Sequence, residues 1–294
     1  MNHENIRSLY SQPFVENLIL AAEKLSDVTS FLSTCKSPVS NEWPEAVVET
    51  RRKELFANHG CLHLNTVEQI KAYKEALRRG IKLHTVIFSL PMTVKMSEQI
   101  GEQLPPGITV LHLNRVCDET HLEAVNHLIK TAKDVQMLRV RDVRAPIRLL
   151  EWPNSVRLKV QFGVQFDQSL AYFCFPANIY AIKFDSLYNR SLKDVQWPVN
   201  LRQIILPRAH ENISDLNLPD SLKILHLGVG YNFSADNGFV LPTELEQLSL
   251  NYDFDMPLDR VRLPVTLKRI DVSNEYKHSL NFLKDTSVQV FRNY

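Results

Sequence analysis

Residues 218–227 read LPDSLKILHL, residues 241–250 read LPTELEQLSL and residues 263–272 read LPVTLKRIDV. Each is a (Leu/Trp/Phe)-Pro-x-x-(Leu/Ile/Val) phrase followed by apolar residues at alternate positions. Further copies begin at Leu104, Trp152, Phe175 and Trp197, and a copy without the proline begins at Thr131. From Pro153 to Pro264, the prolines of successive copies are 21 to 23 residues apart. This regular spacing indicates a repeat protein.

A period near 22 residues holds one short strand and a return segment, which is the length class of leucine-rich repeats. Because so small a unit cannot bury its apolar face alone, successive units must stack. We expect Leu225, Leu248 and Ile270 to lie in register on neighbouring parallel strands, with His226 facing outward. The period leaves no room for full helices on the convex side, so turns and short helical pieces are expected there.

Toward the N-terminus the spacing lengthens and helical periodicity appears between strand-like runs. Strands are expected at 61–64, 83–88 and 110–113, one helix at 67–79, and a second behind a capping box of Thr120 and Glu123. The solenoid is expected to fill residues 60–294 with about ten units, after a linker and capping helix at 45–59 and a small helical domain at 1–44. The predicted fold class is α/β: a leucine-rich-repeat-type solenoid with a parallel β-sheet on its concave face.

The composition excludes several classes of protein. The 34 Lys and Arg residues balance 33 Asp and Glu, so no global attraction to nucleic acid or an anionic membrane is expected. Cys35, Cys61, Cys117 and Cys174 are widely separated and match no zinc or disulfide pattern, which favours a reducing compartment. The first residues lack the basic and apolar regions of a signal peptide. We therefore expect a soluble, cytoplasmic protein without metal or cofactor.

No motif for catalysis stands out. The sequence has no phosphate-binding glycine loop, HExxH or GxSxG. His59, Cys61 and His63 alternate as metal ligands might, but lack a fourth ligand nearby. Cys117 and Asp118 are similar to the acidic-flanked cysteine of bacterial leucine-rich-repeat ubiquitin ligases, whose large catalytic domain is absent from this sequence. We therefore expect no enzyme, and the basic stretch 139–148 leaves nucleic-acid binding as a minor alternative.

The outward residues of the strands should line the concave face, where a partner can bind. These are His112, Arg139, Lys159, Lys183, Ile205, His226, Ser249 and Asp271, flanked by Arg141, Gln203, Gln247 and Arg269. The middle of this row is cationic, which predicts an acidic patch on the partner. The predicted substrate-binding residues are Arg139, Arg141, Lys159, Lys183, Gln203, His226, Gln247 and Arg269. The alternative is that these charges only keep an exposed sheet soluble.

A second phrase follows several strands: an aromatic residue, Asn or Asp, any residue, Ser or Pro, and Leu. It occupies residues 166–170, 188–192 and 254–258, with a looser copy at 276–280. With the proline-led strand and the period, it resembles the FNIP repeat, a leucine-rich-repeat variant, over roughly residues 150–285. We expect the aromatic residue to fill the gap between turns and the Asn or Asp to bond the turn backbone.

Residues 13–36 read PFVENLILAAEKLSDVTSFLSTCK, which fits two short amphipathic helices. One interpretation is a helical hairpin that caps the solenoid. The segment also resembles an F-box, with Pro13 opening an apolar helix, a Leu-Ser-Asp-aliphatic turn at 25–28, and Cys35 and Lys36 near its end. It departs from the family in having Gln12 where a leucine is usual and in a shorter turn. F-box segments followed by FNIP repeats form a family found in giant DNA viruses and amoebae.

This resemblance implies an adapter whose F-box-like segment binds the Skp-type linker subunit of a cullin-RING ubiquitin ligase while the repeats hold a protein substrate. The positions that match the motif are Pro13, Leu18, Leu25, Val28, Phe31, Leu32, Cys35 and Lys36. The alternative is a stand-alone leucine-rich-repeat scaffold without a role in ubiquitination, whose N-terminal segment is only a cap.

Overall fold

The computed structural model divides the chain into two units between Asn58 and His59, and all the described residues lie in the second unit. They are residues 61–64, 74, 78, 80, 83–88, 94–100, 104, 106–114, 116–130, 132–209, 213–231 and 241–293. Only the backbone is described for residues 61–64, 94, 96, 99 and 293. The predicted F-box-like domain and the linker helix at 45–59 lie outside the described residues. Of the helix predicted at 67–79, only Lys74 and Arg78 are described, and both are helical.

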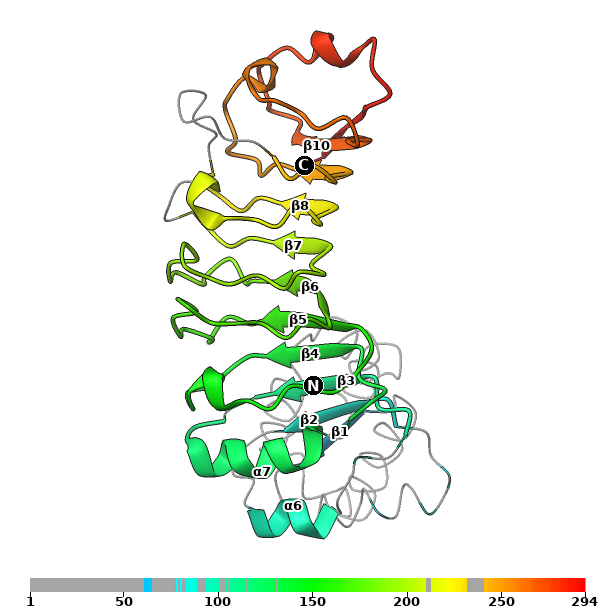
Figure 1. Cartoon of the computed structure of the whole chain (residues 1–294), viewed down its shortest axis with the longest axis vertical. Coiled ribbons are helices and arrows are strands. Elements are labelled where there is room, and N and C mark those ends of the chain that lie inside the picture. The colour runs from blue at the N-terminus through cyan, green and yellow to red at the C-terminus, as the bar shows by residue number, and fades with distance from the viewer. Residues whose placement is uncertain are drawn as a thin grey trace, which may run out of the picture. The chain divides into compact units, whose positions relative to one another are not determined.

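In the described part of the chain, eleven strands form one sheet, in which each strand pairs in parallel with the next one along the chain. The strands follow one another along the long axis of the picture (Figure 1). They are β1 (Cys61–Leu64), β2 (Thr85–Phe88), β3 (Val110–Leu113), β4 (Met137–Val140), β5 (Leu158–Phe162), β6 (Ile179–Lys183), β7 (Gln203–Ile205), β8 (Ile224–His226), β9 (Gln247–Ser249), β10 (Arg269–Ser273) and β11 (Gln289–Asn293). This order confirms the predicted parallel solenoid.

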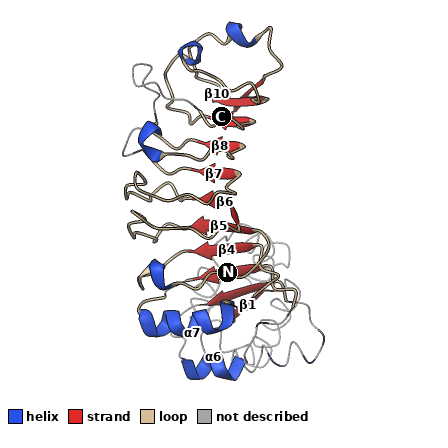
Figure 2. Cartoon of the chain, viewed as in Figure 1, coloured by secondary structure: helices blue, strands red, loops and turns tan. Residues whose placement is uncertain are grey.

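The return segments change along the chain as the period predicts. Among the described residues, α-helices occur only in the early units, where α6 (Val94–Ile100) and α7 (Glu119–Ile129) pack against each other. Later return segments hold turns and short 3-10 helices at Ile147–Leu149, Ile213–Leu216, Leu258–Arg260 and Asn281–Leu283 (Figure 2). Units of about 22 residues are therefore too short for an α-helix, as expected.

The predicted start of α7 was wrong. The helix begins at Glu119, and its N-cap is Asp118 rather than Thr120. The Asp118 carboxylate accepts a hydrogen bond of 3.0 Å from the backbone N–H of His121. A carboxylate at the N-cap also interacts favourably with the positive end of the helix dipole, so it outcompetes the threonine two residues later.

The hydrophobic core runs along the sheet as predicted. Leu225 pairs with Leu248, and Leu248 pairs with Ile270, on consecutive parallel strands. All three side chains are completely buried. This confirms that consecutive units place their aliphatic side chains in register. Burial of a leucine or isoleucine side chain stabilises a fold by roughly 1.5–3 kcal/mol, so the repeated register is the main source of stability.

The aromatic residues of the FNIP-like phrase stack from one unit to the next. The rings of Phe166 and Tyr188 are stacked at 5.9 Å, and those of Phe254 and Tyr276 at 6.2 Å. The hydroxyl of Tyr188 donates to the carbonyl of Gln168 at 3.0 Å in the preceding unit. These contacts confirm that the aromatic residue fills the gap between turns.

The role predicted for the Asn or Asp of that phrase was wrong for Asp167. Asp167 accepts two hydrogen bonds of 2.8 Å from the guanidinium of Arg190 in the next unit. Both side chains are exposed, which lets the carboxylate reach a charged partner instead of the turn. The serine of the phrase bonds the turn backbone, because Ser191 Oγ accepts from the N–H of Lys193 at 3.2 Å.

The unit that carries β5 departs from the repeat. The phrase places Val156 where Leu201 and Leu222 are buried in other units, yet Val156 is 92% exposed and Leu158 is buried in its place. The strand then has one residue between Leu158 and Val160, whereas β6 has two between Ile179 and Ile182, so the pairing shifts register. The proline-led phrase therefore predicts the strand of this unit correctly but not which residue enters the core.

Candidate protein-binding surface

The outer face of the sheet carries two rows of side chains, which we call the first row and the second row. The first row, from β3 to β11, is Val110, Met137, Lys159, Ala181, Gln203, Ile224, Gln247, Arg269 and Gln289. The second row is His112, Arg139, Gln161, Lys183, Ile205, His226, Ser249, Asp271 and Phe291. The predicted outward residues all lie in these rows, except Arg141, which follows β4.

One predicted position was in the wrong row. Lys159 was expected in line with Arg139 and Lys183, but it pairs with Met137 in the first row, and Gln161 lies between the two second-row cations. In regular units the second-row residue is the seventh after the proline, as Lys183 is after Pro176. The unit of β5 has one more residue, so Gln161 is the eighth after Pro153. Sequence alternation alone could not reveal this extra residue.

Four basic residues nevertheless lie together over β4 to β6, and we call them the cationic band: Arg139, Arg141, Lys159 and Lys183. Each is partly exposed, and none takes part in an ion pair with another described residue. The guanidinium of Arg139 lies near two sheet residues, with Nε 3.3 Å from the sulfur of Met137 and Nη1 3.5 Å from Nε2 of His112. The band therefore presents positive charge that described carboxylates do not neutralise.

At the end of this face formed by β9 and β10, acidic and basic side chains of the chain neutralise each other. Asp271 is 6% exposed and accepts hydrogen bonds from Arg269 Nη2 at 2.6 Å, Ser249 Oγ at 2.9 Å and Gln247 Nε2 at 2.9 Å. Burial alone would raise the pKa of Asp271, but these hydrogen bonds outweigh burial and hold the pKa below its ordinary value. Arg269 also lies over the ring of Phe291, with Cζ 4.0 Å from the ring centroid. Two predicted substrate-binding residues, Gln247 and Arg269, are thus held in this network.

His226 lies between these two regions in the second row. Burial lowers the pKa of its imidazole, Asp271 opposes the shift, and Arg269 and Lys183 add to it. The net effect is a pKa below the ordinary value, so the ring is neutral at pH 7. Among the described residues of the two rows, the positive charge that no carboxylate neutralises therefore lies in the cationic band, and Gln203 follows the band in the first row.

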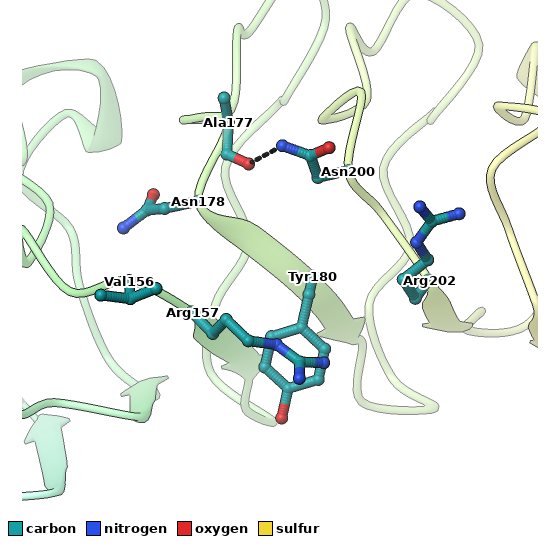
Figure 3. Close-up of a pocket in the computed structure, with 7 residues that line it drawn as sticks. All are labelled: Val156, Arg157, Ala177, Asn178, Tyr180, Asn200 and Arg202. Carbon is teal, nitrogen blue, oxygen red and sulfur yellow. Dashed lines mark hydrogen bonds between the residues drawn. The ribbon is translucent and has the colours of Figure 1, made fainter.

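A hollow of about 370 Å³ lies at the start of β5, β6 and β7 (Figure 3). It is lined by Val156, Arg157, Ala177, Asn178, Tyr180, Asn200 and Arg202. The guanidinium of Arg157 lies over the ring of Tyr180, with Cζ 4.3 Å from the ring centroid. Sequence analysis missed this site. The only signal for it was the strict alternation of apolar residues from Val156 to Phe162, where regular units have two residues between the first and second buried positions.

The described side chains include no group of three or more His, Cys, Asp or Glu residues that could hold a metal ion. The side chains of His59, Cys61 and His63 lie outside the described residues. Cys117 and Cys174 are free thiols. Within the described part of the chain, no helix has the length and apolar character needed to cross a membrane.

The parallel sheet, the buried aliphatic column and the short return segments define a solenoid of the leucine-rich-repeat type. The crystal structure of CroV588, a circular leucine-rich-repeat protein, is similar with a TM-score of 0.53 and 17% identity. The match covers 76% of this chain and 32% of the CroV588 chain, so the chain spans at most about a third of that protein's length. No protein-family model matches the chain, and no curated protein matches it. The likeness supports the fold, while the FNIP and F-box resemblances stay predictions.

Proposed function

We propose that the chain is the substrate-recognition adapter of a cullin-RING ubiquitin ligase. Its solenoid would bind an acidic region of a protein substrate, and its F-box-like segment would bind the Skp-type linker subunit. The observation that carries the first half is the cationic band on an exposed sheet, because repeat solenoids commonly use such extended faces to bind proteins. Four unneutralised cations favour an acidic partner by raising its association rate and disfavouring basic competitors.

The second half of the proposal rests on the sequence. Pro13, Leu25, Val28, Cys35 and Lys36 match an F-box, and FNIP-like repeats follow it in the order of the known family. An adapter needs two separate surfaces and no catalytic group of its own. The second candidate function, a scaffold without a ubiquitin ligase, needs only the solenoid face.

The two candidates differ in whether the chain binds a Skp-type subunit. We expect the tagged full chain to capture purified Skp-type subunit, and to recover a cullin from eukaryotic cell extract. The double variant Leu25→Asp/Phe31→Asp should reduce capture at least tenfold, because a charge on an apolar contact is costly to bury.

The matched control is the triple variant Arg139→Glu/Arg141→Glu/Lys183→Glu, which should keep the Skp-type subunit because its substitutions lie on the sheet. Circular dichroism should show that both variants remain folded. Recovery of neither a Skp-type subunit nor a cullin by the unmodified chain would favour the scaffold.

A further inference from the structure

We propose that the hollow at the start of β5, β6 and β7 is a second recognition site, which takes a carboxylate side chain of an extended peptide together with an apolar neighbour. The inference rests on the protein-binding part of the proposed function and does not require the ubiquitin ligase. A single partner segment could occupy both the hollow and the cationic band, because Lys159 of the band lies two residues after Arg157.

The hollow exists because one unit breaks the repeat. Regular units bury the third residue after the proline, as Leu201 shows after Pro198. In the β5 unit that residue is Val156, which is 92% exposed at the rim of the hollow, while Leu158 fills the core. Register shifts of this kind redirect side chains and are common beside functional sites. Since a valine this exposed contributes nothing to the core, a partner that covers it would gain apolar burial.

Basic residues lie in successive units along the side of the sheet where the strands begin, and most of them pair with a carboxylate of this chain. In later units they are neutralised within the chain: Glu246 lies between Lys223 and Lys268, with both N–O distances 2.6 Å. Hydrogen bonds from these two lysines lower the pKa of Glu246 to about 2, so the carboxylate is charged at neutral pH. Arg202, on the far side of the hollow, pairs with Glu244 at 2.8 Å.

Arg157 is the cation of this edge without such a partner among the described residues. It is exposed, and its guanidinium lies over the ring of Tyr180 (Figure 3). A guanidinium stacked in this way keeps its edge donors free for two parallel hydrogen bonds to a carboxylate. A carboxylate of the partner would therefore form a salt bridge with Arg157, as Glu244 does with Arg202.

The walls of the hollow are fixed by the fold. Asn178 Nδ2 donates to the carbonyls of Pro153 at 3.1 Å and Ser155 at 2.8 Å, and so ties the displaced loop to the next unit. Asn200 Nδ2 donates to the carbonyl of Ala177 at 3.0 Å on the other side. A preformed site loses less conformational freedom on binding. The volume is near the lower end of ligand sites, which suits one or two side chains.

The test is direct binding to the full chain, measured by fluorescence anisotropy with a labelled octapeptide of alternating glutamate and valine. We expect Arg157→Glu to weaken binding at least tenfold, because it places two like charges in contact. Val156→Asp should weaken binding as well, since it removes the apolar contact and adds a negative charge. The matched control, Arg262→Glu, changes an exposed arginine elsewhere and should change binding less than twofold.

Equal effects of Arg157→Glu and Arg262→Glu would overturn the proposal. So would tenfold tighter binding of a phosphoserine-valine peptide, or binding of poly(U) RNA in place of the glutamate peptide. Loss of binding in the Arg139→Glu/Arg141→Glu/Lys183→Glu variant but not in Arg157→Glu would place the peptide on the sheet alone. That result would refute the hollow and leave the proposed function standing. The assay contains no Skp-type subunit, so failure of the ubiquitin connection cannot affect it.

Discussion

Alanine at position 228 will destabilise the solenoid by about 3 kcal/mol, the upper end of the usual cost of overpacking. A Cβ at Gly228 would overlap the backbone carbonyl of Pro207 and crowd the carbonyl of Leu206 in the preceding unit. Neither can move aside easily, because Leu206 donates its N–H to the carbonyl of His226 at 2.9 Å within the sheet. We expect a lower urea midpoint for unfolding of the Gly228→Ala variant.

Gly163→Ala is the matched control, since Gly163 stands at the corresponding place after β5. There the added Cβ would approach Arg141, at 3.1 Å from the side-chain Cγ and 3.2 Å from the Cα. An arginine side chain that is partly exposed can give way by a few tenths of an ångström, so the loss should be about 1 kcal/mol, the lower end of the same range. Equal losses at the two glycines would contradict the close approach of consecutive units at Pro207.

Reversing the charge of three of the four residues of the cationic band will abolish capture of the protein substrate. The variant Arg139→Glu/Arg141→Glu/Lys183→Glu changes side chains that are not ion-paired with described residues, so the fold should survive. Like charges facing each other across an interface cost several kcal/mol, and each 1.4 kcal/mol is a factor of about ten in affinity. We expect loss of captured proteins to below a tenth of the unmodified level, measured by quantitative mass spectrometry.

The control for this experiment is Lys193→Glu/Arg260→Glu/Lys284→Glu, which makes the same change in net charge at exposed positions on the return segments. This variant should capture the same proteins as the unmodified chain. If the band variant also captures them unchanged, the basic side chains of the sheet serve solubility alone, and the acidic-partner hypothesis is wrong.

The fold was predictable because its signals are local and repeated. A proline followed three residues later by Leu201, Leu222, Leu245 or Leu267 marks each regular strand, and the alternation after it sets the two faces. The buried residue of the β5 unit could not be predicted in this way, because Val156 is as aliphatic as Leu158. Only the preceding and following strands decide which of the two is buried. The N-cap of α7 could not be predicted from the sequence either, because Asp118 and Thr120 are both acceptable N-cap residues.

For the candidate protein-binding surface, the sequence predicted which residues face outward but not their neighbours or their hydrogen bonds. Arg139 and Lys183 face outward on the sheet as alternation requires, yet the neighbour between them is Gln161 and not Lys159. Gln247 and Arg269 were predicted to bind the substrate, whereas both donate hydrogen bonds to Asp271 within the sheet. The hollow depends on loops from three consecutive units, so a single repeat cannot predict it.

Every surface described above depends on the register of neighbouring strands, which cysteine cross-linking measures directly. His226 and Ser249 are register partners on β8 and β9, and neighbouring strands lie about 4.8 Å apart, within the range of a disulfide. The double variant His226→Cys/Ser249→Cys should form this cross-link on mild oxidation, identified by mass spectrometry of its peptides. In Ile205→Cys/Ser249→Cys the two cysteines are two strands apart, at about 9.6 Å, and no cross-link should form. A cross-link in the second variant but not in the first would show that the units do not stack in this register.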